Sequence, residues 1–136
     1  MTLRRKSREC ALQMLFQWEI APQDPKHIER NFWKSARAAE STRKFAEELF
    51  EGAVAQVKSS DELAAKFSQN WRLDRMSTID RSILRLAIYE FKAGTAPVKV
   101  VFDEALELAK TFSTPEAGPF LNGLLDAVQK SLQGAK

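Results

Sequence analysis

The hydrophobic positions of the chain recur with the period of an α-helix along almost its whole length. The strongest example is residues 77–91, where apolar side chains cover an arc of roughly 200° around a helix axis. A helix that is apolar over so wide an arc must be covered from two sides. We therefore expect it at the centre of a helical protein. Its narrow polar edge carries Arg81, Ser82, Arg85 and Tyr89.

Both ends of this central segment carry helix signals. Ser77 stands three residues before Asp80, which predicts a reciprocal cap. In such a cap the Ser77 hydroxyl accepts a backbone N–H and the Asp80 carboxylate reaches back. Gly94 supplies a stop, and Pro97 lies just beyond it. The segment is predicted to be structural, so functional side chains should lie on the elements around it.

Further amphipathic helices are predicted on both sides of the central one. They cover approximately residues 4–20, 24–39, 41–57, 59–67, 98–112 and 120–132. Asp24, followed by proline, predicts one helix start, and Ser59 with Glu62 predicts another. Trp71 belongs to an apolar connector, and Gly123 predicts a close approach by a neighbouring helix. No stretch alternates as a β-strand does, so we predict an all-α protein: one compact domain of about seven helices over residues 1–136.

The composition fits such a domain. Of 136 residues, 44% are hydrophobic and 29% are charged, which is typical of a soluble globular protein. Cys10 is the single cysteine, so no disulfide can form within the chain, as expected in a reducing cytoplasm. No signal peptide or membrane-spanning run is visible. A cytoplasmic location is predicted, with no membrane partner.

The distribution of charge points to a binding role. The chain has 21 basic and 18 acidic residues, and its whole net charge of +3 lies in the first nine residues. The four cations there are Arg4, Arg5, Lys6 and Arg8. Cations in the first turn of a helix repel one another and oppose the helix dipole, so stability alone would not select them. A confined basic excess usually faces a polyanion.

The sequence offers little for catalysis or metal binding. His27 is the only histidine, and a zinc site needs several Cys and His ligands. No Gly-rich phosphate loop or nucleophile motif is present. The acidic residues Asp103, Glu104 and Glu107, with Lys99 and Lys110 nearby, fit a solvated helix face. We expect a protein that is not an enzyme and needs no cofactor or metal.

The basic cluster fits contact with RNA phosphates. Four such contacts to single-stranded RNA give a log–log salt slope near −3, at about −0.7 for each contact. Recognising a single strand also needs stacking or base-edge contacts. Phe120, at the expected start of the last helix after a Gly-Pro turn, is the candidate. Two structural alternatives stay open: the cations are a solvated helix end, and Phe120 is a first core residue.

Several blocks of the chain resemble the NusB family. They are RRKSRECALQMLF at residues 4–16, IDRSILRLAIYE at 79–90, PVKV at 97–100, EALELAK at 104–110 and FLNGLLD at 120–126. They follow one another in order over nearly the whole chain, and residues 21–69 form the variable part. The resemblance implies an all-helical RNA-binding protein in which two small bundles form one compact domain.

The same resemblance implies transcription antitermination. A family member binds the single-stranded boxA element of ribosomal RNA leader transcripts together with NusE, a ribosomal protein. It supports processive transcription by the RNA polymerase elongation complex with other Nus factors. The family's RNA contacts match Arg4, Arg5, Lys6, Arg8, Glu116 and Phe120, and its NusE contacts match Phe16 and Asp80. Phe16 stands where a tyrosine is common, Pro119 stands where some members have lysine, and Asp80 also has a structural role as a cap.

The sequence also allows two other interpretations. One is a helical protein–protein scaffold that acts mainly through homodimerisation, since some family members dimerise. The other is a relative of the NusB-like domain that precedes some ribosomal RNA cytosine methyltransferases. The chain ends at Lys136 with no cofactor-binding domain, which disfavours the second interpretation.

Overall fold

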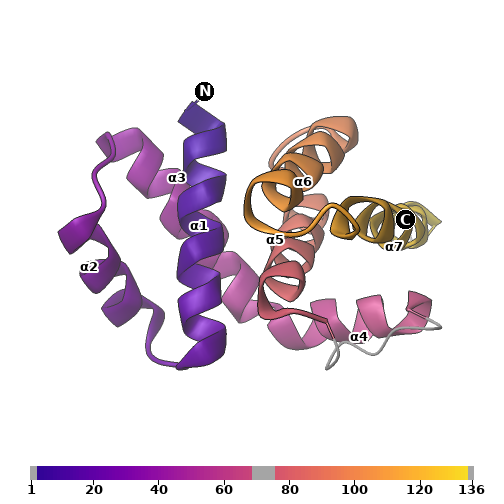
Figure 1. Cartoon of the computed structure of the whole chain (residues 1–136), viewed down its shortest axis with the longest axis horizontal. Coiled ribbons are helices and arrows are strands. Elements are labelled where there is room, and N and C mark those ends of the chain that lie inside the picture. The colour runs from indigo at the N-terminus through magenta and orange to yellow at the C-terminus, as the bar shows by residue number, and fades with distance from the viewer. Residues whose placement is uncertain (1–2, 69–75, 135–136) are drawn as a thin grey trace.

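The computed structural model describes residues 3–68 and 76–134 (Figure 1). Within these ranges the chain forms seven α-helices and no strand. The helices are α1 (Leu3–Ile20), α2 (Pro25–Ser35), α3 (Glu40–Ala55), α4 (Val57–Phe67), α5 (Thr78–Ala93), α6 (Val98–Phe112) and α7 (Ala117–Gly134). The predicted all-α fold is confirmed. Trp71 lies outside the described residues, and none of the described helices is long and apolar enough to cross a membrane.

The central position predicted for α5 is confirmed. It packs against α1 and α3 on one side and against α4, α6 and α7 on the other (Figure 1). Its apolar residues from Ile83 to Ile88 are at most 2% exposed. Ser82 and Arg85, which we placed on a polar edge, are buried as well. The helix is covered on nearly every side, so its polar side chains must find partners inside the protein.

The caps of α5 are partly as predicted. The Ser77 hydroxyl accepts the backbone N–H of Asp80 at 3.1 Å. The Asp80 carboxylate does not complete a reciprocal cap; it accepts a hydrogen bond from the Ser113 hydroxyl at 2.6 Å. At the other end Gly94 has a left-handed backbone with φ of 66°, the conformation in which glycine commonly ends a helix.

Two helix starts lie earlier than the sequence suggested. Helix α4 begins at Val57, and the Ser59 hydroxyl donates to the Gln56 carbonyl at 3.1 Å, so the predicted Ser59 cap is wrong. Helix α7 begins at Ala117 and includes Pro119 in its first turn. Proline is tolerated there because the first N–H groups of a helix have no partner within it. Phe120 therefore lies one turn inside α7.

The helices form two groups that meet along α1 and α5. Helices α1, α2 and α3 make one group and α4 to α7 the other (Figure 1). A single hydrophobic core runs through both groups and takes residues from each of the seven described helices. Cys10 is part of this core at 3% exposure. The junction of α1 with α5 thus sets how the two groups are held together.

Replacing Gly52 by alanine should destabilise the protein. Gly52 of α3 lies against the ring of Tyr89 on α5, and an added Cβ would overlap that ring. Alanine gains about 1 kcal/mol of helix propensity, but displacing the half-buried ring costs about 1–3 kcal/mol. We expect a net loss of about 1 kcal/mol in the free energy of unfolding, measured by urea denaturation.

Gly123→Ala is the matched control. Gly123 is exposed on α7, and in the part of the chain that the structure describes no atom outside the adjacent backbone of α7 lies within 4 Å of the position of an added Cβ. The predicted close approach of a helix at Gly123 is therefore wrong. Gly123→Ala should stabilise the protein by up to about 1 kcal/mol. If both variants gained stability equally, the contact between Gly52 and Tyr89 would not be close enough to exclude an added methyl group.

Candidate nucleic-acid interface

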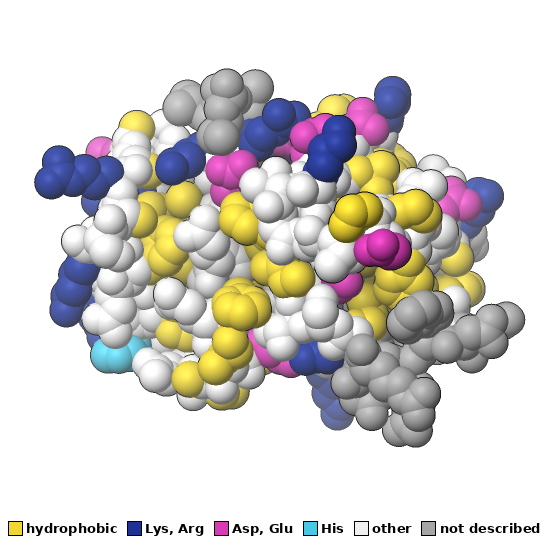
Figure 2. Space-filling view, viewed as in Figure 1, with side chains coloured by type: hydrophobic (Ala, Val, Ile, Leu, Met, Phe, Trp, Pro, Cys, Tyr) yellow, Lys and Arg dark blue, Asp and Glu magenta, His cyan; other side chains and the backbone are white. Residues whose placement is uncertain are grey.

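The four N-terminal cations do not share one environment. Arg4 and Lys6 are exposed, Arg5 is partly exposed and Arg8 is buried. Figure 2 shows basic and acidic side chains interleaved at the end of the molecule where α1 begins. Inside the protein at this end, Glu104 of α6 pairs with Arg5 and Glu90 of α5 pairs with Arg8. The four cations therefore differ in how readily they can contact an anion.

Arg8 is part of the protein interior. Its side chain is 4% exposed. Its Nε and Nη2 donate to the two carboxylate oxygens of Glu90 at 2.9 and 2.8 Å. Glu104 lies 3.6 Å from Nη1. To reach an RNA phosphate, Arg8 would have to leave Glu90 as a buried unpaired charge, which is strongly unfavourable. We therefore remove Arg8 from the RNA contacts that the sequence suggested.

Arg5 forms an ion pair within the protein but stays partly exposed to solvent. Its Nη2 donates to Glu104 Oε2 at 2.7 Å, while its side chain stays 39% exposed. This hydrogen bond, with the charge of Glu104, raises the pKa of the Arg5 guanidinium further above its ordinary value. Glu104 is 8% exposed, so its predicted place on a solvated face is wrong. Glu104 faces α1 because it lies one turn before Leu108 on the buried stripe of α6.

The neighbours of Glu104 on α6 behave as predicted. Lys99 pairs with Asp103 at 3.1 Å, and Lys110 approaches Glu107 at 3.9 Å, all on the outer face of the helix. Exposed pairs of this kind contribute little to stability. These carboxylates lie on α6, whereas Arg4 and Lys6 are exposed at the start of α1.

Arg4 and Lys6 are the cations most open to an anion. The Arg4 guanidinium lies 3.8 Å from the centre of the Phe45 ring on α3, a cation–π contact that restrains the side chain at the surface. Lys6 is exposed and has no ion pair with the residues that the structure describes. An arginine that is restrained but keeps N–H groups outward is well suited to a phosphate.

A hollow of about 1210 Å³ lies beside Arg5. Its walls come from the second half of α6, the α6–α7 connection and the start of α7. The lining residues besides Arg5 are Asp103, Leu106, Glu107, Lys110, Ser113, Thr114, Pro115, Gly118, Pro119 and Asn122. The fold thus joins the N-terminal cations to the segment around the start of α7. The sequence reasoning missed Lys110, Thr114 and Asn122, whose only signal was polarity close to the predicted Phe120 contact.

Glu116 and Phe120 lie in this neighbourhood but do not line the hollow. Glu116 is exposed in the α6–α7 connection. The Phe120 ring is half buried and packs against the hydrophobic core. A half-buried ring can serve both as a core residue and as a surface for stacking, so both interpretations of Phe120 stay open. The roles of Glu116 and Phe120 in RNA binding stay predictions.

The two residues expected to face a partner protein lie at the opposite end of α1. Phe16 is half buried and borders a hollow of about 300 Å³ between the end of α1 and α2. Asp80 begins α5, and the neighbouring Arg81 donates to Glu19 of α1 at 2.7 Å, which brings these two helix ends together. Asp80 is also bonded to Ser113, which lines the larger hollow. One hydrogen bond thus connects the predicted partner surface to the candidate RNA surface.

The sole histidine is a surface residue beside the hollow that Phe16 borders. His27 is exposed on α2, and its Nε2 is 3.0 Å from the Asn31 side chain of the same helix. The expectation that it is a surface histidine is confirmed.

Comparison with known proteins gives a consistent result. A model of the NusB family matches residues 5–130. The chain is 43% identical to a transcription antitermination protein NusB of Koribacter versatilis over 98% of this chain and 92% of that protein. It is also 43% identical to the protein of the same name in Myxococcus xanthus, over 97% and 98% of the two chains.

Solved structures agree with this result. The NusB of T. maritima is 31% identical and superposes with a TM-score of 0.84 over 96% of this chain and 92% of that one. A structure of antitermination factors NusB and NusE in complex with dsRNA is 24% identical, with a TM-score of 0.87 over 96% and 98%, and supports the fold. The chain belongs to the NusB family.

Proposed function

We propose that this protein is a transcription antitermination factor that binds single-stranded boxA-type RNA together with NusE. The observation that carries the proposal is the continuity between the N-terminal cations and the hollow lined by α6 and α7. Arg4, Arg5 and Lys6 supply contacts to phosphates, which give affinity without sequence preference. Polar side chains of the hollow, such as Thr114 and Asn122, are placed to reach base edges.

The similarity to NusB proteins supports an RNA partner and a NusE partner. Relatives more than 40% identical are transcription antitermination proteins. The structure of NusB and NusE with dsRNA contains a protein of the same fold beside its protein and RNA partners. In this chain we assign NusE to the end that carries Phe16 and Asp80. Because Asp80 holds Ser113 in the wall of the hollow, NusE contacts at Asp80 would also set the shape of the RNA surface. RNA and NusE should therefore bind more tightly together than separately.

The test is a titration of boxA-type RNA at several salt concentrations, with and without NusE. Arg4→Ala/Lys6→Ala should weaken binding about tenfold and make the log–log salt slope about 1.4 less steep, because two phosphate contacts are lost. Lys58→Ala/Lys66→Ala on α4 is the control, since it removes the same charge from two exposed lysines away from the start of α1 (Figure 1). Double-stranded RNA of the same sequence should bind more weakly. Equal losses in both double variants, or none in either, would contradict the assignment.

Removing the charge of Glu104 should strengthen RNA binding. Glu104→Gln releases Arg5 from its ion pair, so the guanidinium can turn toward a phosphate. We expect about a 2–5-fold gain in affinity at low salt, because Arg5 then binds a phosphate without competition from the Glu104 carboxylate. Glu62→Gln, at an exposed position on α4, is the control for loss of one negative charge. An affinity that is unchanged in Glu104→Gln, or raised equally in Glu62→Gln, would contradict the contact between Arg5 and the RNA.

A further inference from the structure

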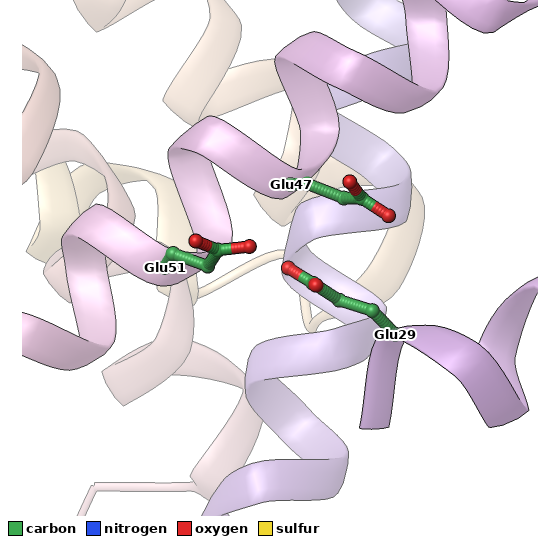
Figure 3. Close-up of side chains that lie close together, drawn as sticks. All are labelled: Glu29, Glu47 and Glu51. Atoms are coloured by element: carbon green, nitrogen blue, oxygen red, sulfur yellow. The ribbon is translucent and has the colours of Figure 1, made fainter. Parts of the chain in front are cut away.

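Three glutamates meet between α2 and α3, away from the start of α1. Glu29 comes from α2, and Glu47 and Glu51 are one turn apart on α3, so both face α2. One carboxylate oxygen of each residue lies within 4.8 Å of the others. Figure 3 shows the Glu29 carboxylate directed toward the space between Glu47 and Glu51. Neither the RNA surface nor the predicted NusE surface uses this cluster.

Glu29 is the unusual member of the cluster. Its side chain is 4% exposed, and its Oε2 is buried without a hydrogen-bond partner. A buried carboxylate oxygen without a partner is strongly disfavoured. The site therefore favours a positive species, either a proton or a cation, between the carboxylates.

The protein's own cations only partly balance these charges. Lys26 Nζ lies 2.8 Å from Glu51 Oε2 and 3.7 Å from Glu29 Oε1, but its side chain is 61% exposed. The guanidinium of Arg43 lies over the Trp33 ring, 5.1 Å from its centre. Arg30, Lys34 and Arg43 line the hollow beside Glu29 and Glu47 but form no ion pair with the cluster, so Lys26 is the one described cation that pairs with these carboxylates. A single proton on Glu29 can bridge to only one of the other two carboxylates.

The surroundings also hold the cluster in place. Trp33 Nε1 donates to Glu47 Oε2 at 2.9 Å, which fixes that carboxylate and leaves its other oxygen available. Ligands of metal sites are commonly oriented by such outer hydrogen bonds. Oxygens within 4.8 Å of one another are close enough to bind one ion through bonds of about 2.3–2.6 Å, as for Ca²⁺, which accepts a flexible geometry, whereas Mg²⁺ demands a near-ideal octahedron.

We propose that Glu29, Glu47 and Glu51 bind a hard divalent cation, with Ca²⁺ as the ion that best suits three carboxylates without a preformed octahedral site. Each glutamate supplies one oxygen, and water completes the coordination. Lys26 moves into solvent when the ion enters, which its exposure permits. The ion would satisfy the orphaned oxygen of Glu29 and fasten α2 to α3. It would have a structural role, separate from the RNA surface at the start of α1.

The test is calorimetric titration of the full chain with Ca²⁺ and, separately, with Mg²⁺. We expect one saturable Ca²⁺ site, with Mg²⁺ bound more weakly. Glu29→Gln and Glu51→Gln should each weaken Ca²⁺ binding at least tenfold. Glu29→Gln keeps the shape of the side chain and removes a buried charge, so it should fold, which circular dichroism checks. Glu48→Gln, exposed on the same helix, removes the same charge outside the cluster and should leave the affinity unchanged.

A second measurement locates the ion independently. Tb³⁺ bound at the cluster should show luminescence sensitised by Trp33, and Trp33→Phe should remove most of it. The proposal is overturned if no saturable Ca²⁺ binding occurs at about 1 mM, the weak end of carboxylate-built sites. It is equally overturned if Glu29→Gln and Glu51→Gln bind Ca²⁺ as the wild type does, because the ion would then lie elsewhere.

Discussion

Replacing Arg8 by alanine should lower the free energy of unfolding by about 3–5 kcal/mol. The Arg8 guanidinium and the Glu90 carboxylate are 4% and 3% exposed and are 2.8 Å apart. Without Arg8, Glu90 keeps a hydrogen bond from the Thr95 hydroxyl at 2.7 Å, but its charge stays buried without a counter-ion. The cost comes from that unpaired charge rather than from the net stabilisation by the pair. Urea denaturation at neutral pH measures the loss.

Arg4→Ala is the matched control for this prediction. Arg4 lies one turn earlier on the same helix and carries the same charge, but it is exposed over Phe45. Its loss should cost at most about 1 kcal/mol, the range of an exposed cation–π contact. Replacing Arg8 and Glu90 together by apolar residues of similar size should recover much of the stability. A cost below about 1 kcal/mol for Arg8→Ala would contradict a structural Arg8.

Replacing Glu19 by glutamine should cost about 2–3 kcal/mol near neutral pH. Glu19 accepts hydrogen bonds from Arg81 and Arg85, each at 2.7 Å, and so ties the end of α1 to the start of α5. Arg85 also pairs with Asp61 at 2.8 Å, which limits the loss. The carboxylate is 20% exposed, so the pairing is only partly screened by solvent.

The effect of Glu19→Gln should depend on pH. Burial alone would raise the pKa of Glu19, but hydrogen bonds and charge from Arg85 and Arg81 lower it below 4.5. The stability that Glu19 contributes is therefore fully present above pH 4.5, the value of the unfolded chain. It is lost as pH falls through the lower pKa of the folded state. The gap between wild type and variant should be widest near pH 7 and shrink on acidification.

Thermal or urea unfolding at several pH values measures this gap. Glu62→Gln, exposed on α4, should show none at any pH. A deficit of Glu19→Gln that stays constant from neutral to acid pH would mean that lost packing, and not the charge of Glu19, is responsible.

Together these pairs describe how the two groups of helices are joined. Arg8 with Glu90 lies near one end of the α1–α5 contact, and Glu19 with Arg81 and Arg85 lies near the other. The hydrophobic core fills the space between them. Charges in both pairs come from residues that the sequence placed on polar faces or in the RNA site.

The sequence predicted the helices well because each one follows from the periodicity of its own residues. It could not predict which charges pair, since Arg8 and Glu90 are far apart in the chain and meet only through packing. Periodicity nevertheless carried a signal. Arg8 lies three and four residues before the buried Ala11 and Leu12, so it continues the core stripe of α1. An arginine on a core stripe predicts a buried partner as readily as a surface anion.

The candidate site was predictable only in part. The cations of α1 were visible in the sequence because their charge is local. The hollow beside Arg5 was not, because only the tertiary fold brings Arg5 of α1 to the stretch from Asp103 to Asn122 that forms its other walls. The early start of α7 at Ala117 was also not predicted. The connection before it is held to α5 by the hydrogen bond from Ser113 to Asp80, a contact that the local sequence does not reveal.

Homodimerisation stays a prediction that light scattering over a concentration series can test.

The most direct test follows the arginine side chains while RNA is added. In ¹⁵N-resolved NMR spectra, the Nε–Hε signals of Arg4 and Arg5 should shift progressively as boxA-type RNA is titrated. The signal of Arg8 should stay in place because Glu90 holds its Nε at 2.9 Å, and that of the exposed Arg30 on α2 should also stay. If Arg8 moved with the RNA while Arg4 and Arg5 did not, the RNA surface assigned to this protein would be wrong.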